Sequence, residues 1–380
     1  MAQTETTFEN RLLEIFEHLH AHPELSWKET ETTAYILRLL QSEGVRTFTF
    51  DDCTGLIAEI GTGSPVVAVR ADIDALWQQV NGTFQANHSC GHDAHMSIVI
   101  GALLKLKDEV TNGTVRFIFQ PAEETGTGAL KMVDKGIVDD VDYLFGIHLR
   151  PIEELPFGKI TPSVHHGAVA FLNGKVIGDD AHGARPHQAV NAIEVLSSLS
   201  RQLNTICFSP FEPYSAKMTR LEAGGQSLNI IPGSGTFGLD VRAQRNKVLL
   251  ELQKAVEHKI EQISMLYEVK IDYEWMDFTP AAEVSKDAEA FLKKGIIETV
   301  GENGLAEPLI TPGSDDFHFY TIKRPHIKAA MMGLGSDLAP GLHHPNMTFD
   351  RRIIKIGTDA LTASVKYALA EVNSHNEDPQ

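Results

Sequence analysis

Val115-Arg116-Phe117-Ile118-Phe119-Gln120 is a short, largely apolar run that ends directly before Pro121-Ala122-Glu123-Glu124. Similar runs occupy 55–60, 66–70 and 143–148. Runs of this length without strict alternation are typical of strands that are covered on both faces. Helical spacing of apolar residues follows at 96–107 and 127–135. Together these patterns predict an α/β fold with a mostly parallel sheet.

The pattern of the sequence changes around Gly167, where a second set of elements begins. They are a strand at 168–177, a helix at 189–206, strands at 214–222 and 235–242, a helix at 247–267 and a strand at 270–275. This β-α-β-β-α-β order is that of a split βαβ sandwich. After residue 280 the helix-then-strand pattern returns. We therefore predict a discontinuous larger domain, 1–166 and 280–380, with a smaller sandwich domain inserted at 167–279.

The composition excludes several classes of partner. The chain of 380 residues carries 33 Lys and Arg against 51 Asp and Glu, a net charge of -18. Because this charge repels phosphate backbones and anionic lipid, we expect no nucleic-acid partner and no membrane contact. Three cysteines, Cys53, Cys90 and Cys207, are too few for a disulfide framework. With no apolar run of about 18 residues and no signal-peptide pattern, we expect a cytoplasmic protein.

Metal-ligand chemistry is concentrated in His88-Ser89-Cys90-Gly91-His92-Asp93-Ala94-His95, a loop between two apolar runs. Cys90 and His92 are within reach of one ion, because Gly91 lets both side chains turn toward the same point. Most of the 17 histidines are expected to be surface or hydrogen-bonded core residues. Cys90 with His92 is the exception, since the pair is flanked by acids at the ends of predicted strands.

Further donors stand where the predicted strands end. Asp72, the pair Glu123-Glu124, and His148 each follow or close an apolar run. In open α/β sheets, ligands bind beyond the carboxyl ends of the strands, so these side chains are expected to converge. Two adjacent carboxylates repel each other unless a cation or a shared proton compensates them. One can therefore bind metal while its neighbour acts as a base, and the whole set predicts a metallohydrolase.

These residues resemble the aminoacylase and carboxypeptidase family of dinuclear metallohydrolases, in particular its bacterial amidohydrolases of the hippurate hydrolase and indole-acetyl-amino-acid hydrolase type. The resemblance covers nearly the whole chain. Its motifs lie at 18–26, 70–76, 90–93, 120–124, 146–148, 182–187, 229–232, 313–317 and 342–345. One departure is Trp77 in place of the usual proline, followed by a shorter connection at 78–87. Another is the segment 176–180, which is less basic and less glycine-rich than in relatives.

The resemblance implies that five side chains hold two divalent metal ions: Cys90, His92, Glu124, His148 and His343. His343 is preferred to His344, which the sequence alone does not separate from it, because it occupies the ligand position of the family's Leu-His-x-Pro pattern. Glu123 would be the general base. Thiolate, imidazole and carboxylate ligands suit Zn or Mn, and they also tolerate Co or Ni.

The resemblance also assigns roles in the inserted domain, which would serve as a lid or dimerisation domain. His182 would stabilise an oxyanion, in a homodimer across the subunit interface, while Asn229 and Arg242 would hold the carboxylate end of the substrate. Exposed edge strands in such a domain favour a homodimer, and the sequence leaves a monomer open.

The predicted function is hydrolysis of the amide bond of N-acyl amino acids, or related small amides, by a metal-activated water. One alternative within the family is a small-peptide exopeptidase. A second alternative makes Cys90 a thiol nucleophile with His92 or His95 as its base, and a third is a non-catalytic protein that binds amino-acid derivatives. The cysteine mechanism leaves Glu124, His148 and His343 without a role.

Overall fold

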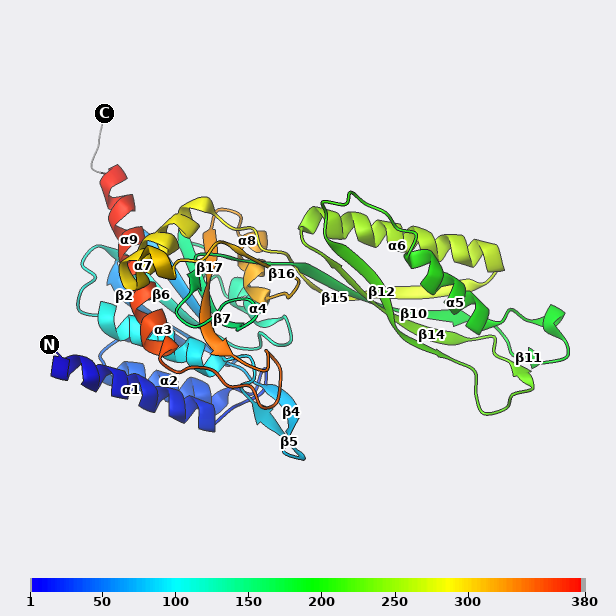
Figure 1. Cartoon of the computed structure of the whole chain (residues 1–380), viewed down its shortest axis with the longest axis horizontal. Coiled ribbons are helices and arrows are strands. Elements are labelled where there is room, and N and C mark those ends of the chain that lie inside the picture. The colour runs from blue at the N-terminus through cyan, green and yellow to red at the C-terminus, as the bar shows by residue number, and fades with distance from the viewer. Residues whose placement is uncertain (1, 377–380) are drawn as a thin grey trace. The chain divides into compact units, whose positions relative to one another are not determined.

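The computed structural model describes residues 2–376 and divides the chain into two compact units (Figure 1). The first comprises Met1–His165, Glu283–Ile310 and Asp316–Gln380, and the second His166–Ala282 and Thr311–Asp315. The segment Thr311–Asp315 was expected in the larger domain. It joins the second unit because Gly167 N–H donates to the carbonyl oxygens of Thr311, at 3.1 Å, and Gly313, at 2.9 Å. A lid or dimerisation role for the second unit stays a prediction.

The first unit is built on a seven-stranded sheet in the order β1-β2-β6-β3-β7-β17-β8. Its four central strands are mutually parallel: β6 (Gly113–Gln120), β3 (Val66–Asp72), β7 (Tyr143–Pro151) and β17 (Lys328–Leu338). The flanking strands run antiparallel to their neighbours: β1 (Arg46–Thr49), β2 (Leu56–Thr62) and β8 (Ile160–Thr161). The predicted α/β class is confirmed, with a parallel centre and antiparallel edges.

Both faces of this sheet are covered, which explains the unbroken apolar runs. Along β3, Val67 and Val69 join one buried core while Val66 and Ala68 join another. The first core includes side chains of α1 (Ala2–Ala21), α2 (Thr30–Ser42), α3 (His92–Leu106), α7 (Lys286–Gly304) and α9 (Ile353–Asn376). The second includes side chains of α4 (Gly128–Asp134) and α8 (Phe319–Lys323).

The second unit is an antiparallel sheet with two helices packed against it (Figure 1). The strand order is β12 (Tyr214–Ala223), β14 (Gly235–Ala243), β10 (Ala168–Ile177) and β15 (Lys270–Thr279), and the helices are α5 (Ala192–Leu203) and α6 (Asn246–Tyr267). Buried and exposed residues alternate along most of β10, as expected for a sheet with one covered face. In chain order the elements are β-α-β-β-α-β.

Short elements complete the chain. They are the hairpin β4 (Leu76–Val80) and β5 (Thr83–Asn87), the strand pair β11 (Ala181–His182) and β13 (Ile230–Ile231), β9 (Val164–His166), β16 (Leu309–Thr311), and the 3-10 turns η1 (Pro186–Gln188) and η2 (Asp316–His318). Within residues 2–376, we find no helix that is both long and apolar enough to span a membrane.

The close packing of α7 on α9 gives a test of the first unit. A Cβ added at Gly295 would lie 2.6 Å from Ser364 N and 2.7 Å from Ala360 O, both backbone atoms. Backbone atoms can move aside only if the packing of the two helices changes. Gly295→Ala should therefore lower the free energy of unfolding by about 1–3 kcal/mol, measured by chemical denaturation. Gly225→Ala is the control, since nothing lies within 4 Å of its added Cβ. Equal stability of the two variants would contradict this packing.

Candidate metal centre

The predicted donors of the first unit lie at the carboxyl ends of neighbouring strands. Asp72 is the last residue of β3, and Glu123 and Glu124 follow β6 after a short turn. His148 lies in β7, which pairs in parallel with β3. The loop from β5 delivers Cys90 just before α3 begins. The topology therefore brings together residues that are distant in the sequence.

Gly91 shapes the loop at the start of α3. Its φ is 85°, in the left-handed region, and a Cβ added there would lie 2.9 Å from Leu149 Cδ1. Only glycine satisfies both conditions without strain. The tight turn at this residue places Cys90 and His92, on either side of it, in the same buried site.

The donors form two groups that share one thiol. In the first group, ligand atoms of Cys90, His92 and His148 lie within 4.8 Å of one another, and in the second the same holds for Cys90, Glu124 and His343. A third overlapping group joins His92, Glu123 and Glu124. The geometry thus brings all five predicted ligands and the predicted base together.

The spacing and the missing partners of these atoms fit a metal. Cys90 Sγ lies 3.6 Å from His148 Nε2, and His343 Nε2 lies 3.5 Å from Glu124 Oε2. Atoms that each lie about 2 Å from one ion are about 3–4 Å apart. His92 Nε2 and Glu124 Oε1 are buried and have no hydrogen-bond partner among the described residues. Buried polar atoms of this kind are costly unless something binds them, so the residues present suit a divalent cation.

Backbone carbonyls orient the two buried histidines. The Nδ1–H of His92 donates to Asp74 O at 2.9 Å, and the Nδ1–H of His148 donates to Leu149 O at 2.6 Å. Each ring then directs Nε2 toward the other donors, which is the usual arrangement of metal-binding histidines. His344 differs, because its Nδ1 accepts the N–H of Asn346 at 3.1 Å.

Electrostatics among these side chains indicate a need for positive charge. Burial raises the pKa of the Cys90 thiol well above its usual value, and Glu124 adds to the rise. Burial also raises the pKa of Glu124 to about 7. Burial opposes protonation of His92, but Asp72 and Cys90 together raise its pKa well above the usual range. Burial keeps the pKa of His148 well below normal, so this ring is the neutral form that binds metals.

Two buried carboxylates that the sequence did not single out hold the turn with Glu123 and Glu124. Glu29 accepts the N–H of Ala122 at 2.8 Å, and Asp74 accepts the N–H of Glu124 at 3.0 Å. Ala122 has a φ of 53°, unusual for a residue with a side chain, so the turn needs such support. Glu29 lies far from this turn in the sequence, so no local pattern reveals its role.

Asp72 belongs to a buried network behind the donors. It accepts hydrogen bonds from Arg70 Nη1 and from His95 Nδ1, each at 2.7 Å. His95 Nε2 accepts the N–H of Leu149 at 3.0 Å, so both ring nitrogens of His95 are engaged. Arg70 also donates to Asp316 at 2.7 Å. Asp72 therefore fixes surrounding side chains, and its Oδ2 also lies 3.7 Å from His92 Nε2. Asp74 contacts the same histidine through its backbone carbonyl.

The other three predicted site residues lie in the second unit. His182 in β11 is exposed and pairs across the strand with Ile230, next to Asn229. The carbonyl oxygen of Asn229 accepts the N–H of Gly183 at 2.7 Å. Arg242 lies on β14 and forms an ion pair with Asp240 at 2.9 Å. The structure thus brings His182 and Asn229 together. It does not bring Arg242 to them, because Arg242 lies at the far end of β14, seven residues beyond Gly235 and so roughly 23 Å along the strand.

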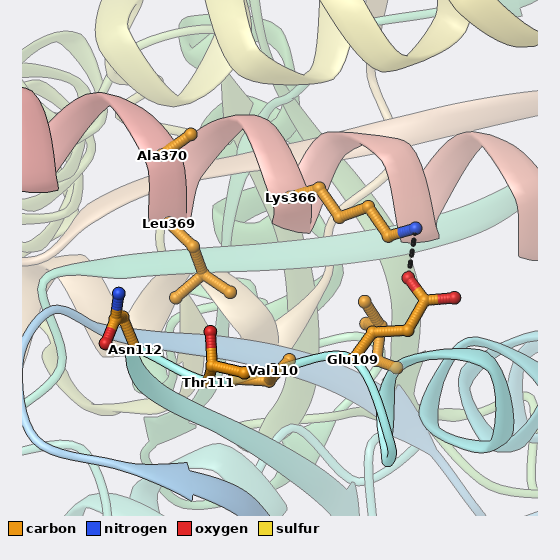
Figure 2. Close-up of a pocket in the computed structure, with 8 residues that line it drawn as sticks. Glu109, Val110, Thr111, Asn112, Lys366, Leu369 and Ala370 are labelled. Atoms are coloured by element: carbon orange, nitrogen blue, oxygen red, sulfur yellow. Dashed lines mark ion pairs between the residues drawn. The ribbon is translucent and has the colours of Figure 1, made fainter.

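A separate pocket of about 270 Å³ lies between the end of α3 and α9, and Figure 2 shows its lining. Its charged side chains, Lys366 and Glu109, form an ion pair with each other at 2.5 Å. None of the predicted site residues lines this pocket. It offers no unmatched charge to a ligand.

Comparison with known proteins identifies relatives that match most of the chain. Residues 68–367 match the model of peptidase family M20/M25/M40. The N-acetylcysteine deacetylase of Bacillus subtilis is 30% identical over 92% of this chain and 95% of its own length. An IAA-amino acid hydrolase of Arabidopsis thaliana is 32% identical over 80% of this chain and 72% of its own length.

Comparison with solved structures identifies the same family. A dinuclear metal-binding M20 peptidase of Bacillus subtilis matches with a TM-score of 0.81 at 28% identity, over 96% of this chain and 99% of that one. Because the family model covers most of the chain and the curated relatives match nearly all of it, the chain belongs to peptidase family M20/M25/M40.

Proposed function

We propose that this chain is a metal-dependent amidohydrolase that cleaves N-acyl amino acids into a carboxylic acid and a free amino acid. The observation that carries the proposal is that Cys90 belongs to two donor groups, while a third, overlapping group joins the carboxylate of Glu123 to His92 and Glu124. The named activities of the relatives, an N-acetylcysteine deacetylase and an IAA-amino acid hydrolase, support this substrate class.

The metal ligands in this proposal are Cys90, His92, Glu124, His148 and His343. They would hold two divalent ions, Zn or Mn in the first instance, with Co or Ni also compatible. Such ions, when bound, lower the pKa of a water ligand to about 7 and polarise a carbonyl oxygen. The matched solved structure from Bacillus subtilis is described as a dinuclear metal-binding peptidase, and this description supports two ions.

Glu123 is the proton carrier in this mechanism. Its carboxylate takes the proton of the attacking water and returns it to the nitrogen of the leaving amine. The Glu123 side chain is 12% exposed, so it is shielded yet reachable from solvent, and its Oε2 lies 3.8 Å from His92 Nε2. The hydrogen bond from Ala122 N–H to Glu29 holds the turn that carries this carboxylate.

We assign the second unit to substrate binding. His182 Nδ1 accepts the N–H of Ala184 at 3.0 Å, so the ring proton is on Nε2, where it can donate to an oxyanion. Arg242 donates to Asp240 and, at 3.2 Å, to Pro312 O, which leaves one N–H on each terminal nitrogen for a substrate carboxylate. Asn229 lies beyond the opposite end of β14 from Arg242, so it would share that carboxylate from the partner protomer of a homodimer. A homodimer belongs to the same proposal.

The alternatives have different standing. A small-peptide exopeptidase remains a second candidate, because the matched structure from Bacillus subtilis is described as a peptidase. A cysteine nucleophile needs a lowered thiol pKa, whereas burial raises the pKa of the Cys90 thiol. His95, one of the two bases considered for it, has both ring nitrogens in hydrogen bonds.

The three described cysteines, Cys53, Cys90 and Cys207, are free, in line with the proposed reducing, cytoplasmic location.

A panel of substrates tests the function. Metal-loaded wild-type protein should release free amino acid from acetyl, benzoyl or indole-acetyl amino acids, and dipeptides in the same panel separate the exopeptidase alternative. Glu123→Gln should lower kcat by about 100-fold or more with both ions retained, because it removes the proton carrier and leaves the ligands. Glu153→Gln, an exposed glutamate, is the matched control. If metal content falls together with activity in Glu123→Gln, Glu123 is not the base.

Removal of metal tests the ligand set by stability. Adding Zn or Mn at about 100 times its Kd to chelator-treated protein should raise the free energy of unfolding by about 2.7 kcal/mol, seen as an increase in Tm. Cys90→Ser should lose most of this gain, because Cys90 belongs to both donor groups. Cys53→Ser should keep it. A Tm that does not respond to either ion in the wild type would exclude this metal centre.

A further inference from the structure

The hairpin formed by β4 and β5 contacts the metal centre through one amide. Gln78 Nε2 donates to His343 O at 2.7 Å. Gln78 Oε1 accepts from Ser89 Oγ at 2.8 Å and from Asn87 Nδ2 at 3.1 Å. Ser89 directly precedes Cys90, so a single side chain links the backbone of one proposed ligand to the residue before another.

Asn87 extends this connection. Its Nδ2 also donates to Pro345 O at 3.1 Å, two residues beyond His343. One amide hydrogen goes to each acceptor, so every bond uses a donor or acceptor that the side chains possess. We call Gln78 and Asn87 together the amide clamp. It joins the hairpin to two backbone carbonyls of the loop that carries His343, those of His343 and Pro345.

His343 needs such support more than the other proposed ligands. Its side chain is 54% exposed, whereas those of His92 and Glu124 are 1% and 8% exposed. Its φ of 63° lies in the left-handed region, which is strained for a residue with a side chain. Besides the clamp, its own N–H donates to Ser89 O at 2.8 Å. The position of this ligand therefore depends on hydrogen bonds from neighbouring segments.

The opposite face of the hairpin does not take part. Side chains alternate along a strand, so Trp77 and Gln79 point away from the face of Gln78. Trp77 and Phe84 stack there, 59% and 57% exposed, with ring centroids 6.3 Å apart. Among the residues that the structure describes, Gln79 donates only to Gly82 O, at 3.3 Å, within the hairpin turn. This strand thus offers a glutamine that contacts the metal loop next to one that does not.

We propose that Gln78 is a positioning residue for the metal centre, and that the amide clamp holds His343 against Glu124 so that the ion of the Cys90, Glu124 and His343 group is retained. The inference rests on the proposed function, in which His343 is a metal ligand. The hairpin would then position a metal ligand, a role that neither its exposed aromatic face nor its length suggests.

Metal affinity in Gln78→Ala tests the proposal. The metal content of the full chain is measured by elemental analysis after equilibration with a graded chelator, using Zn as the probe. Gln78→Ala should weaken retention of one of the two ions on the order of 10-fold, as loss of a residue that orients a ligand usually does, and leave the other ion unchanged. Gln79→Ala should retain both ions like the wild type.

Two further variants separate the outcomes. His343→Ala should lose the same ion more completely. If His343→Ala keeps both ions, His343 is not a ligand and the proposed metal site fails with the clamp. If His343→Ala loses an ion and Gln78→Ala binds both normally, only the clamp is wrong. Should Gln78→Ala not fold, Gln78→Met keeps the length of the side chain without its hydrogen bonds, and the same two outcomes apply to it.

Discussion

The structure depends on one electrostatic constraint, the burial of thiol, imidazole and carboxylate groups in one place. His92 Nε2 and Glu124 Oε1 have no hydrogen-bond partner among the described residues, and burial raises the pKa of both Cys90 and Glu124. Burying polar groups without partners costs several kcal/mol, and cations remove that cost. The parallel centre of the sheet creates the situation, because it directs neighbouring strand ends to the same edge.

The groups behind the donors explain how the site keeps its shape. Arg70 is fully buried between Asp72 and Asp316, so its charge is balanced on both sides. Asp74 and Glu29 use their carboxylates to hold backbone N–H groups around the Glu123 turn. Buried ionic groups that are held by several hydrogen bonds favour one arrangement over others. Hydrogen bonds among the chain's own residues thus hold the groups around the donors in place, and such preorganisation is the condition for tight and selective coordination.

The sequence predicted the parts of this site that follow from local pattern. Apolar runs marked β3, β6 and β7, and Cys-Gly-His marked a loop that brings two donors into one site. The sequence alone could not show that Glu29 supports the turn of Glu123, because that contact joins segments that are distant in the chain. Nor could it show that Gln78, unlike Gln79, reaches the loop of His343, since this depends on the pairing register of a hairpin. The transfer of Thr311–Asp315 to the second unit likewise follows from long-range backbone bonds.

The most direct test of the metal centre is an anomalous difference map from crystals of the Zn-loaded chain, recorded at the zinc absorption edge. The account predicts two peaks in the first unit, one bounded by Cys90, His92 and His148 and the other by Cys90, Glu124 and His343. A catalytically active crystal with no peak among these side chains, or with peaks only elsewhere, would contradict it.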